Sequence, residues 1–473
     1  MSERHPDGYL KKKREPIGYR DPDERKKDYN EIYAPEWKEE DLQDQGKRCM
    51  DCGLPTCMSG CPLGNIIPDW NDLVYRDDWK EALDRLHATN NFPEFTGYTC
   101  PAPCESSCVL AYNNGPVAIK SIERAIVDKG WEMGWIQPEP PAHRTGYKVA
   151  IIGSGPAGLS AAQQLNRAGH EVTVYERDDE IGGLMTYGIP DFKFAKKQVA
   201  RRVDQLEKEG IEFKTGIEVG NDVTLEDLRD SYSAVCLAIG AQKHRELQIP
   251  GRELDGVHEA MEYLTRENRN QAGKKVDDHI SAKDRHTIVL GGGDTGADCV
   301  ATAHRQGAES VVQISINPKK PDSRTADHPW PFQPLTYKKT YAIDEGGVEE
   351  FRINTLELLD SDDDGCVDQL LTERVDWIRD ENGSRVDKNV IEPDLKMPAD
   401  LVLIAIGFEG TQAGPFEGTG LELERGVFKT DDNMMTTVEG VFAGGDANMG
   451  QSLVVWAIGE GRDVARNIDA YLM

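Results

Sequence analysis

The sequence predicts an α/β protein in which a helical N-terminal part precedes two βαβ units. Residues 1–145 hold seven of the ten cysteines and helix-like stretches such as DDWKEALDRLHATNN. Residues 147–177 and 286–317 each run from an apolar strand through a glycine turn and a helix into a second strand, which is the pattern of a parallel sheet. These observations predict two Rossmann-like dinucleotide-binding domains after the helical domain. The segment QPEPPAHRTG is predicted to be the linker between the helical domain and the first dinucleotide-binding domain.

Acidic residues outnumber basic ones by 84 to 55, and the formal net charge is −29 at pH 7. Affinity for nucleic acid depends mainly on clustered Lys and Arg, so we expect no nucleic-acid partner. The mean hydropathy of −0.59 and the lack of an apolar run of about 18 residues predict no membrane span. The first residues, MSERHPDGYLKKKREP, lack the apolar core of a secretory signal. We therefore expect a cytoplasmic protein with reduced thiols.

The first βαβ unit carries a G-x-G-x-x-G turn made of Gly153, Gly155 and Gly158. In such a turn the first glycine permits the tight bend, the second lets the backbone approach a pyrophosphate, and the third lets the helix pack on the strand. Glu176 closes the second strand 18 residues after Gly158, where a carboxylate accepts hydrogen bonds from ribose hydroxyls. The unit is thus predicted to bind a dinucleotide at the helix N-terminus.

Two further glycine motifs favour FAD as this dinucleotide. Gly182 and Gly183 follow Glu176, and VEGVFAGGDANMG places Gly445 and Asp446 between a strand and a helix. The pattern resembles the flavin disulfide-reductase-like family, in which the late Gly-Asp element holds the flavin ribitol and pyrophosphate. That family inserts its NAD(P)H domain within its FAD domain, and here AVCLAIGA and LVLIAIGFEG occupy the two crossing points.

The second βαβ unit is predicted to bind NADPH, because its glycine turn resembles the NADPH-binding turn of the same family. The residues of this turn are Gly291, Gly293, Asp294, Thr295 and Gly296. The second strand, SVVQISIN, ends without the acidic residue that would bind the ribose 2′-hydroxyl of NADH and repel a 2′-phosphate. The cations that are candidates for contacting this phosphate are Arg305, Lys319, Lys320 and Arg324. The same cations would also serve simply to offset an acidic surface.

The seven N-terminal cysteines fall in two runs, C-x2-C-x4-C-x3-C-P and C-x3-C-x3-C. The first run is close to the bacterial ferredoxin motif, whose last cysteine ligates the other cluster. A zinc site is the alternative, because C-x2-C pairs also suit tetrahedral thiolate coordination. Zinc is redox-silent, however, and a chain with flavin and nicotinamide sites has a use for one-electron carriers. This favours two [4Fe-4S] clusters.

Two such clusters need eight ligands, and the two runs supply seven cysteines. The other three cysteines look structural, since Cys236 lies in a core strand, Cys299 on a helix and Cys366 in an acidic loop. The eighth ligand is therefore expected to be another residue type close to Cys108. The segment NNGPVAIKSIERAIVDKG offers Glu123 on a predicted helix.

Several longer segments resemble the glutamate synthase small (β) subunit family, with similarity from about Gly8 to the C-terminus. They are RCMDCGLPTCMSGCPLGNIIPDWNDLVY, TNNFPEFTGYTCPAPCESSC, VAIKSIERAI and GQSLVVWAIGEGR. The wider family includes the cluster-bearing part of dihydropyrimidine dehydrogenase and the large subunit of the NADH-dependent ferredoxin:NADP oxidoreductase. The ligands that the resemblance implies for one cluster are Cys49, Cys52, Cys57 and Cys108. Those that it implies for the other are Cys61, Cys100, Cys104 and Glu123. The pyrimidine enzyme has a longer first gap after the position of Cys100.

The resemblance also implies how the chain is divided and used. Residues 1–145 would hold the clusters, 146–250 and 400–473 would form the FAD domain, and 251–399 would form the inserted NADPH domain. NADPH would pass a hydride to FAD, and the clusters would carry single electrons outward. No general acid or base is expected for this chemistry.

The electrons are expected to leave the chain. The sequence shows neither the N-terminal cysteine nucleophile of a glutaminase nor a third large α/β domain in which 2-oxoglutarate would be aminated. The resemblance implies that the partner is the glutamate synthase large (alpha) subunit, which makes glutamate from glutamine and 2-oxoglutarate. One alternative is the large subunit of an NADH-dependent ferredoxin:NADP oxidoreductase, or another NAD(P)H-dependent FAD/iron-sulfur electron-transfer subunit. In another class, the alternative is a non-catalytic zinc-binding scaffold.

Overall fold

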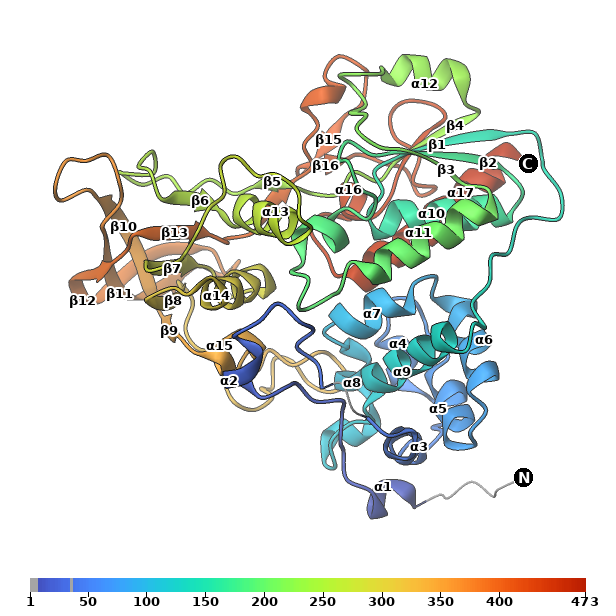
Figure 1. Ribbon diagram of the computed structural model, residues 1–473, viewed down its shortest axis with the longest axis horizontal. Helices are drawn as coiled ribbons and strands as arrows, with labels where there is room; N and C mark the ends of the chain where they lie inside the picture. Colours follow the sequence, from blue (N-terminus) through green and yellow to red (C-terminus); the bar gives the residue numbers. More distant parts are fainter. Residues whose placement is uncertain (1–6, 35–36) are drawn as a thin grey trace.

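The computed structural model describes residues 7–34 and 37–473. Figure 1 shows a bundle of short helices below an upper sheet, with a second sheet to the left of both. This arrangement confirms the predicted α/β class, with a helical N-terminal part followed by two units built on parallel sheets. None of the helices in the described residues is long and apolar enough to cross a bilayer.

The helical part is organised around α9 (Ile119–Glu132), which packs against most of its neighbours. Ile119, Ile122 and Ile126 are spaced three and four residues apart and therefore share the buried face of α9. The other helices are α1 (Gly8–Lys11), α2 (Pro22–Arg25), α3 (Glu39–Lys47), α4 (Thr56–Ser59), α5 (Ile67–Tyr75), α6 (Trp79–Thr89), α7 (Pro93–Thr99), α8 (Pro103–Ser107) and η1 (Val109–Tyr112).

The first sheet has five parallel strands in the order β17-β4-β1-β2-β3. Its strands are β1 (Lys148–Ile152), β2 (Glu171–Tyr175), β3 (Glu212–Lys214), β4 (Ala234–Leu237) and β17 (Val441–Ala443). The helices around it are α10 (Pro156–Arg167), η2 (Leu184–Gly188), α11 (Lys197–Glu209), α12 (Leu225–Ser231), α16 (Asp446–Met449) and α17 (Val454–Leu472). Helices α10 and α17 cross closely because Gly461 has no side chain: a Cβ there would lie 2.3 Å from the carbonyl oxygen of Ala157.

The second sheet also has five parallel strands, in the order β6-β13-β7-β8-β9. Its strands are β6 (Val257–Glu259), β7 (His286–Leu290), β8 (Ser310–Ser315), β9 (Val348–Phe351) and β13 (Leu401–Ile404). The helices that pack on it are α13 (Ala260–Gln271) and α14 (Asp294–Gln306), and α15 (Tyr341–Glu345) packs on α14. Every strand residue of β13 is buried, as expected for the centre of a parallel sheet covered on both faces.

A three-stranded antiparallel sheet extends from the second unit at the left of Figure 1. It consists of β10 (Ile353–Leu359), β11 (Gln369–Arg379) and β12 (Arg385–Pro398). The sequence pattern does not predict this sheet. Most of β12 is exposed on both faces, so the strand lacks the alternation of buried and exposed residues that identifies a half-buried strand.

Two short strands, β5 (Lys243–His244) and β14 (Phe408–Gly410), pair where the chain crosses between the units. The insertion of the second unit within the first is thereby confirmed, but its expected end at residue 399 is wrong. β13 belongs to the second sheet, between β6 and β7, so the chain returns only after Ile404. The segment LVLIAIG contains this last strand together with the crossing, and the sequence pattern does not separate the two. Small remaining elements are η3 (Gly414–Phe416), β15 (Leu423–Glu424) and β16 (Val427–Phe428).

Buried ion pairs join the three parts. Glu94 on α7 accepts two hydrogen bonds of 2.7 Å from the guanidinium of Arg202 on α11, and both side chains are almost fully buried. Glu345 on α15 pairs at 2.6 Å with Arg25 of α2 and at 2.5 Å with Arg305 of α14. These contacts fix the helical part against both sheets.

The Arg202–Glu94 pair gives a prediction for stability. In the Glu94→Ala variant the Arg202 guanidinium stays buried without its carboxylate, and loss of one partner of a buried pair costs about 3–5 kcal/mol. We expect the free energy of unfolding of the cooperative unit that contains α7 and α11 to fall by about this amount in urea titrations. Asp204→Ala on the same helix removes an ion pair that is mostly exposed and should cost no more than about 1 kcal/mol. Equal losses in the two variants would contradict a structural role for the buried pair.

Candidate functional site

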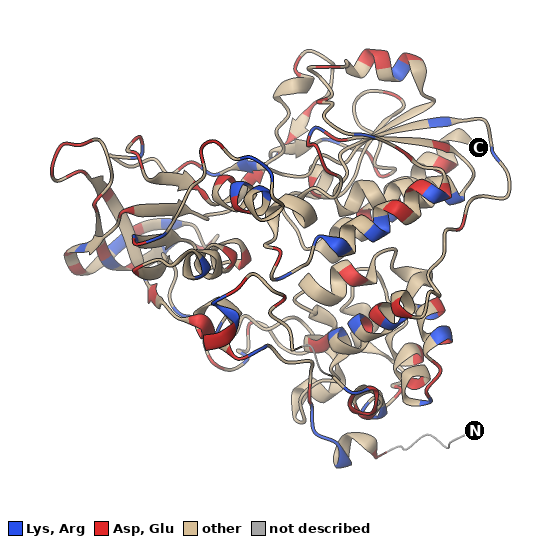
Figure 2. Ribbon diagram, in the orientation of Figure 1, with Lys and Arg blue, Asp and Glu red and all other residues tan. Residues whose placement is uncertain are grey.

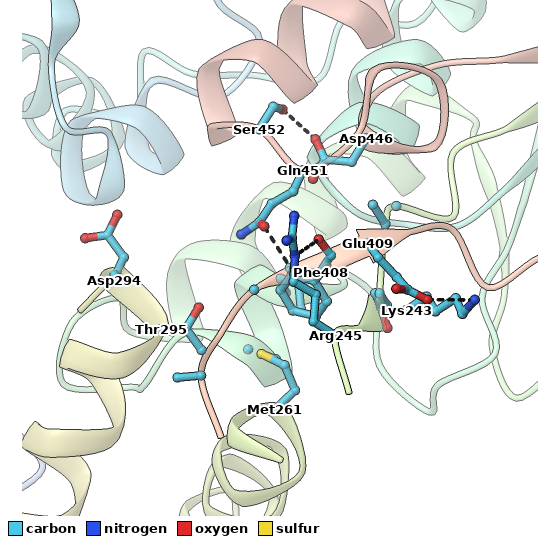
Figure 3. Close-up of a pocket in the computed structure, with 18 of the residues that line it drawn as sticks. Lys243, Arg245, Met261, Asp294, Thr295, Phe408, Glu409, Asp446, Gln451 and Ser452 are labelled. Carbon is cyan, nitrogen blue, oxygen red and sulfur yellow. Dashed lines mark hydrogen bonds and ion pairs between the residues drawn. The ribbon is translucent and has the colours of Figure 1, made fainter. Parts of the chain in front are cut away.

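A cleft of about 2250 Å³ separates the two sheets and is lined from both units. Pockets for one small ligand usually measure about 300–1,000 Å³, so this cleft has room for more than one. The glycine turns after β1 and β7, at the carboxyl ends of parallel strands, face into it. Figure 3 shows Asp294 and Thr295 entering from the start of α14, with Asp446, Gln451 and Ser452 on the opposite side.

The first glycine turn has the stereochemistry that the sequence predicts. Gly153 has φ +100°, and a Cβ there would lie 2.4 Å from the carbonyl oxygen of Ala238. A Cβ on Gly158 would lie 2.0 Å from the carbonyl oxygen of Gly153. Gly155 instead has no atom within 4 Å of its Cβ position and lines the cleft. The backbone is therefore open at the position where a pyrophosphate would approach the N-terminus of α10.

Glu176 lies beside this turn, directly after β2, and lines the cleft. Its Oε2 accepts hydrogen bonds from the backbone N–H of Ser154 at 3.0 Å and from the Ser154 hydroxyl at 2.5 Å. Its Oε1 accepts one from the backbone N–H of Asp178 at 2.9 Å. A carboxylate offers about four lone-pair sites, so capacity remains for ribose hydroxyls.

The other residues predicted for FAD surround the same turn. Gly183 lines the cleft, and a Cβ on it would lie 3.0 Å from the Cα of Gly155. Gly182 and Gly445 do not line the cleft in the described chain but permit close packing behind it. Asp446 lines the cleft and accepts a hydrogen bond of 2.5 Å from the Ser452 hydroxyl, while burial raises the pKa of its carboxyl.

The second glycine turn repeats the geometry of the first. A Cβ on Gly291 would lie 2.1 Å from the carbonyl oxygen of Ala405, and one on Gly296 would lie 2.3 Å from the carbonyl oxygen of Gly291. Gly293, the middle glycine, has open space at its Cβ position and lines the cleft. Nearby, Lys193 of the first unit pairs at 2.7 Å with Asp298 on α14. Both residues of this buried pair line the cleft.

Two of the predicted phosphate-binding cations are placed elsewhere, which corrects the expectation. Arg305 is buried in its pair with Glu345 and does not line the cleft. Arg324 donates to the carbonyl oxygens of His328 and Phe332, at 2.9 and 2.5 Å, and stabilises its own loop. Sequence proximity to the turn did not reveal these competing partners. Lys320 lines the cleft, and so does Arg385 of β12, which sequence analysis missed.

The cysteines gather around two small cavities in the helical part. The first is lined by Cys49, Cys52, Cys57 and Cys108. Burial raises the pKa of the Cys57 thiol to about 12, and the neighbouring thiols add to this. The cavity lies near the surface, because Leu54 in its loop is 86% exposed.

The second cavity is lined by Cys61, Cys100, Cys104 and Glu123, all of which are buried. Burial raises the pKa of the Glu123 carboxyl to about 7, although hydrogen bonds to Thr96 and Asn90 act in the opposite direction. Both bonds end on Oε1, at 2.7 and 3.0 Å. The two cavities therefore bring together the same two sets of four residues that the family resemblance implied.

The spacing of these thiols tests the zinc alternative. Thiolates that share a tetrahedral zinc at about 2.3 Å lie about 3.8 Å apart. Within the described residues, no three of the cysteine sulfur atoms lie within 4.8 Å of one another. The described thiols thus do not show the close spacing of a zinc site. The other group that cysteine-rich sets of four ligands hold is a [4Fe-4S] cluster.

The second cavity adjoins the cleft. Cys100 lines the cavity, while its neighbours Thr99 and Pro101 line the cleft. Val455 of α17 likewise lines the cavity, and Val454 lines the cleft. Ile67 and Ile119 line both cysteine cavities. The structure therefore places the cleft, the second (inner) cavity and the first (outer) cavity as a connected series.

Two family descriptions match the chain. The family "Dihydroprymidine dehydrogenase domain II, 4Fe-4S cluster" matches residues 25–135. The family "Pyridine nucleotide-disulphide oxidoreductase" matches residues 147–328 and 364–461. The first match contains the seven cysteines and Glu123 that line the two cavities, and the second contains both glycine turns.

Individual proteins extend these matches. FprA from Mycobacterium tuberculosis in complex with NADPH is similar in fold, with TM-score 0.55 and 19% identity over 69% of this chain and 84% of that one. "Glutamate synthase [NADH]" of Schizosaccharomyces pombe is 46% identical over 98% of this chain and 22% of its own length. "Glutamate synthase [NADPH] small chain" of Mycobacterium tuberculosis is 50% identical over 99% of this chain and 96% of its own length. The chain therefore belongs to the glutamate synthase [NADPH] small-chain family of the pyridine nucleotide-disulphide oxidoreductases.

Proposed function

We propose that this chain is the electron-input subunit of a glutamate synthase, oxidising NADPH and delivering electrons to a larger subunit that makes glutamate from glutamine and 2-oxoglutarate. The observation that most supports this function is that the cleft, the inner cavity and the outer cavity adjoin one another in series within one chain. Oxidation of one NADPH releases NADP⁺, one proton and two electrons. When bound, FAD accepts the hydride and the [4Fe-4S] clusters carry single electrons.

The first glycine turn is assigned to FAD. The open backbone at Gly155 and the N-terminus of α10 would hold the pyrophosphate, and Glu176 would hold the ribose hydroxyls. The surrounding backbone would approach FAD closely because of three glycines, Gly182, Gly183 and Gly445. Asp446 would contact the ribitol of FAD. The second turn, from Gly291 to Gly296, is assigned to NADPH on the same geometry.

Two [4Fe-4S] clusters are assigned to the cysteine cavities. The inner cluster would be held by Cys61, Cys100, Cys104 and Glu123. The outer cluster would be held by Cys49, Cys52, Cys57 and Cys108. Because the inner cavity adjoins the cleft and the outer one lies near the surface, electrons would travel in that order and leave near the exposed loop that carries Leu54.

The partner assignment is supported by chain length. The region equivalent to this chain fills 22% of the single-chain Schizosaccharomyces pombe relative. The remainder of such a protein would correspond to a separate large subunit here.

The thiol-rich cavities and the charge of −29 support a cytoplasmic location without a nucleic-acid partner. Figure 2 shows acidic and basic residues interspersed along α11 and α9.

The decisive experiment is anaerobic NADPH oxidation with glutamine and 2-oxoglutarate, with and without a separately purified glutamate synthase large subunit. Glutamate that forms only with both chains is the expected result. If NADPH reduces the bound flavin but no glutamate forms, the electron-input chemistry stands and the partner is wrong. Ferredoxin reduction would then be measured as the competing function.

Flavin content should depend on Glu176. In Glu176→Arg the carboxylate that anchors the turn is replaced by a bulky cation, and we expect the purified protein to lose its flavin absorbance. Glu171→Arg makes the same charge change at the exposed start of the same strand and should retain flavin. Full flavin content in Glu176→Arg, measured after heat release of the cofactor, would overturn the FAD assignment.

Electron delivery should depend on Cys61. In Cys61→Ala the inner cluster loses a ligand, so NADPH should still reduce the flavin while transfer to the large subunit falls. We expect the rate of electron transfer to the large subunit to fall by more than the roughly 10–100-fold loss of activity that follows removal of a residue hydrogen-bonded to a metal ligand. Stopped-flow reduction and coupled glutamate formation separate the two steps. Cys366→Ala, at an exposed loop cysteine, is the control, and equal transfer in both variants would contradict the proposed route.

A further inference from the structure

The antiparallel sheet that extends from the second unit brings two arginines together at one end of the cleft. β11 ends at Arg379 and β12 begins at Arg385, so the two residues flank the hairpin turn. Arg379 Nη2 donates a hydrogen bond to Asn317 Oδ1 at 3.2 Å, and Arg385 Nη2 donates one to the same oxygen at 3.1 Å. Asn317 and Arg385 both line the cleft.

Asn317 occupies a chemically informative position. It follows β8, the second strand of the βαβ unit that contains the Gly291–Gly296 turn. In dinucleotide-binding units the end of this strand meets the 2′-position of the adenosine ribose, and a carboxylate there selects the unphosphorylated coenzyme. Ser315, Asn317 and Lys320, at and after the end of β8, line the cleft and carry no negative charge. Glu349 and Glu350 of the neighbouring β9 also line it, but their carboxylates accept hydrogen bonds from Tyr337 and Arg374.

The two arginines carry positive charge that the surrounding protein does not neutralise. In the described part of the chain, neither Arg379 nor Arg385 forms a salt bridge, although acidic residues outnumber basic ones by 84 to 55. Their shared acceptor is a neutral amide. Burial and the adjacent Arg379 lower the pKa of Arg385, yet an arginine stays protonated at neutral pH. Two adjacent guanidiniums without a carboxylate favour an anion between them.

We propose that Arg379 and Arg385 bind the 2′-phosphate of NADPH, with Asn317 orienting both guanidiniums and Lys320 adding a third cation. This inference rests on the proposed use of NADPH and deepens it. The two arginines act as specificity-determining residues, because they contact a part of the coenzyme that does not react. It also gives the antiparallel sheet a role, since the sheet carries both arginines to the end of β8 from outside the βαβ segment of residues 286–317.

The test uses the purified flavin- and cluster-containing protein and isothermal titration with 2′,5′-ADP and with 5′-ADP. Hydrogen bonds to a charged group predict that Arg385→Ala and Arg379→Ala each weaken 2′,5′-ADP binding by about 10- to 100-fold. Affinity for 5′-ADP should stay within about twofold of wild type, and Arg385→Lys should recover part of the loss. Lys396→Ala removes the same charge from an exposed position of β12 and should leave both affinities unchanged.

Coenzyme kinetics supply a second readout. The KM for NADPH should rise in the arginine variants, while the rate with NADH should stay at the wild-type value. If both variants bind 2′,5′-ADP as tightly as wild type while NADPH still reduces the flavin, the inference is overturned and the proposed function stands. If the wild-type protein does not distinguish 2′,5′-ADP from 5′-ADP and NADPH does not reduce its flavin, the proposed use of NADPH fails as well.

Discussion

The buried ion pair between Arg202 and Glu94 holds the helical part against the first sheet, and the connected series of sites depends on that placement. A buried charge without its partner is strongly unfavourable, so neither side chain separates from the other at low cost. The Arg25–Glu345–Arg305 cluster applies the same constraint to the second sheet. The orientation on which electron transfer depends is therefore imposed by desolvated charge pairs, in a chain whose formal net charge is −29 at pH 7.

The two nucleotide-binding turns share one construction. In each, the first glycine packs on the carbonyl oxygen of an alanine, Ala238 in one case and Ala405 in the other. Those alanines begin the Ala-Ile-Gly segments at which the chain passes between the two units. The same short segments thus close the turns and define the crossing. A change in the crossing would alter both cofactor-binding turns, which links the insertion of one unit in the other to the shape of the cleft.

Local patterns in the sequence predicted the parts of the site that are built from local structure. The turns at Gly153 and Gly291 and the helix that carries Glu123 lie where spacing placed them, because their geometry depends on neighbours a few residues away. Arg305 and Arg385 show the limit of this reasoning. Arg305 is close to the turn in sequence, but it forms a buried ion pair with Glu345. Arg385 reaches the cleft on β12, whose mostly exposed residues show no alternation that would identify a strand. The positions of both arginines depend on contacts with residues distant from the turn in sequence, which local patterns do not reveal.

The inner cavity has a consequence for how the protein is made. Its wall includes Val455, which belongs to α17, the C-terminal helix. The cavity is therefore incomplete until α17 has docked. Cys61, Cys100 and Cys104 are each at most 8% exposed once it closes. Under the proposed assignment, iron and sulfide must reach these thiols before or during docking of α17, whereas the outer cavity remains accessible from its surface loop. Under the same assignment, maturation of the inner cluster is coupled to the docking of α17.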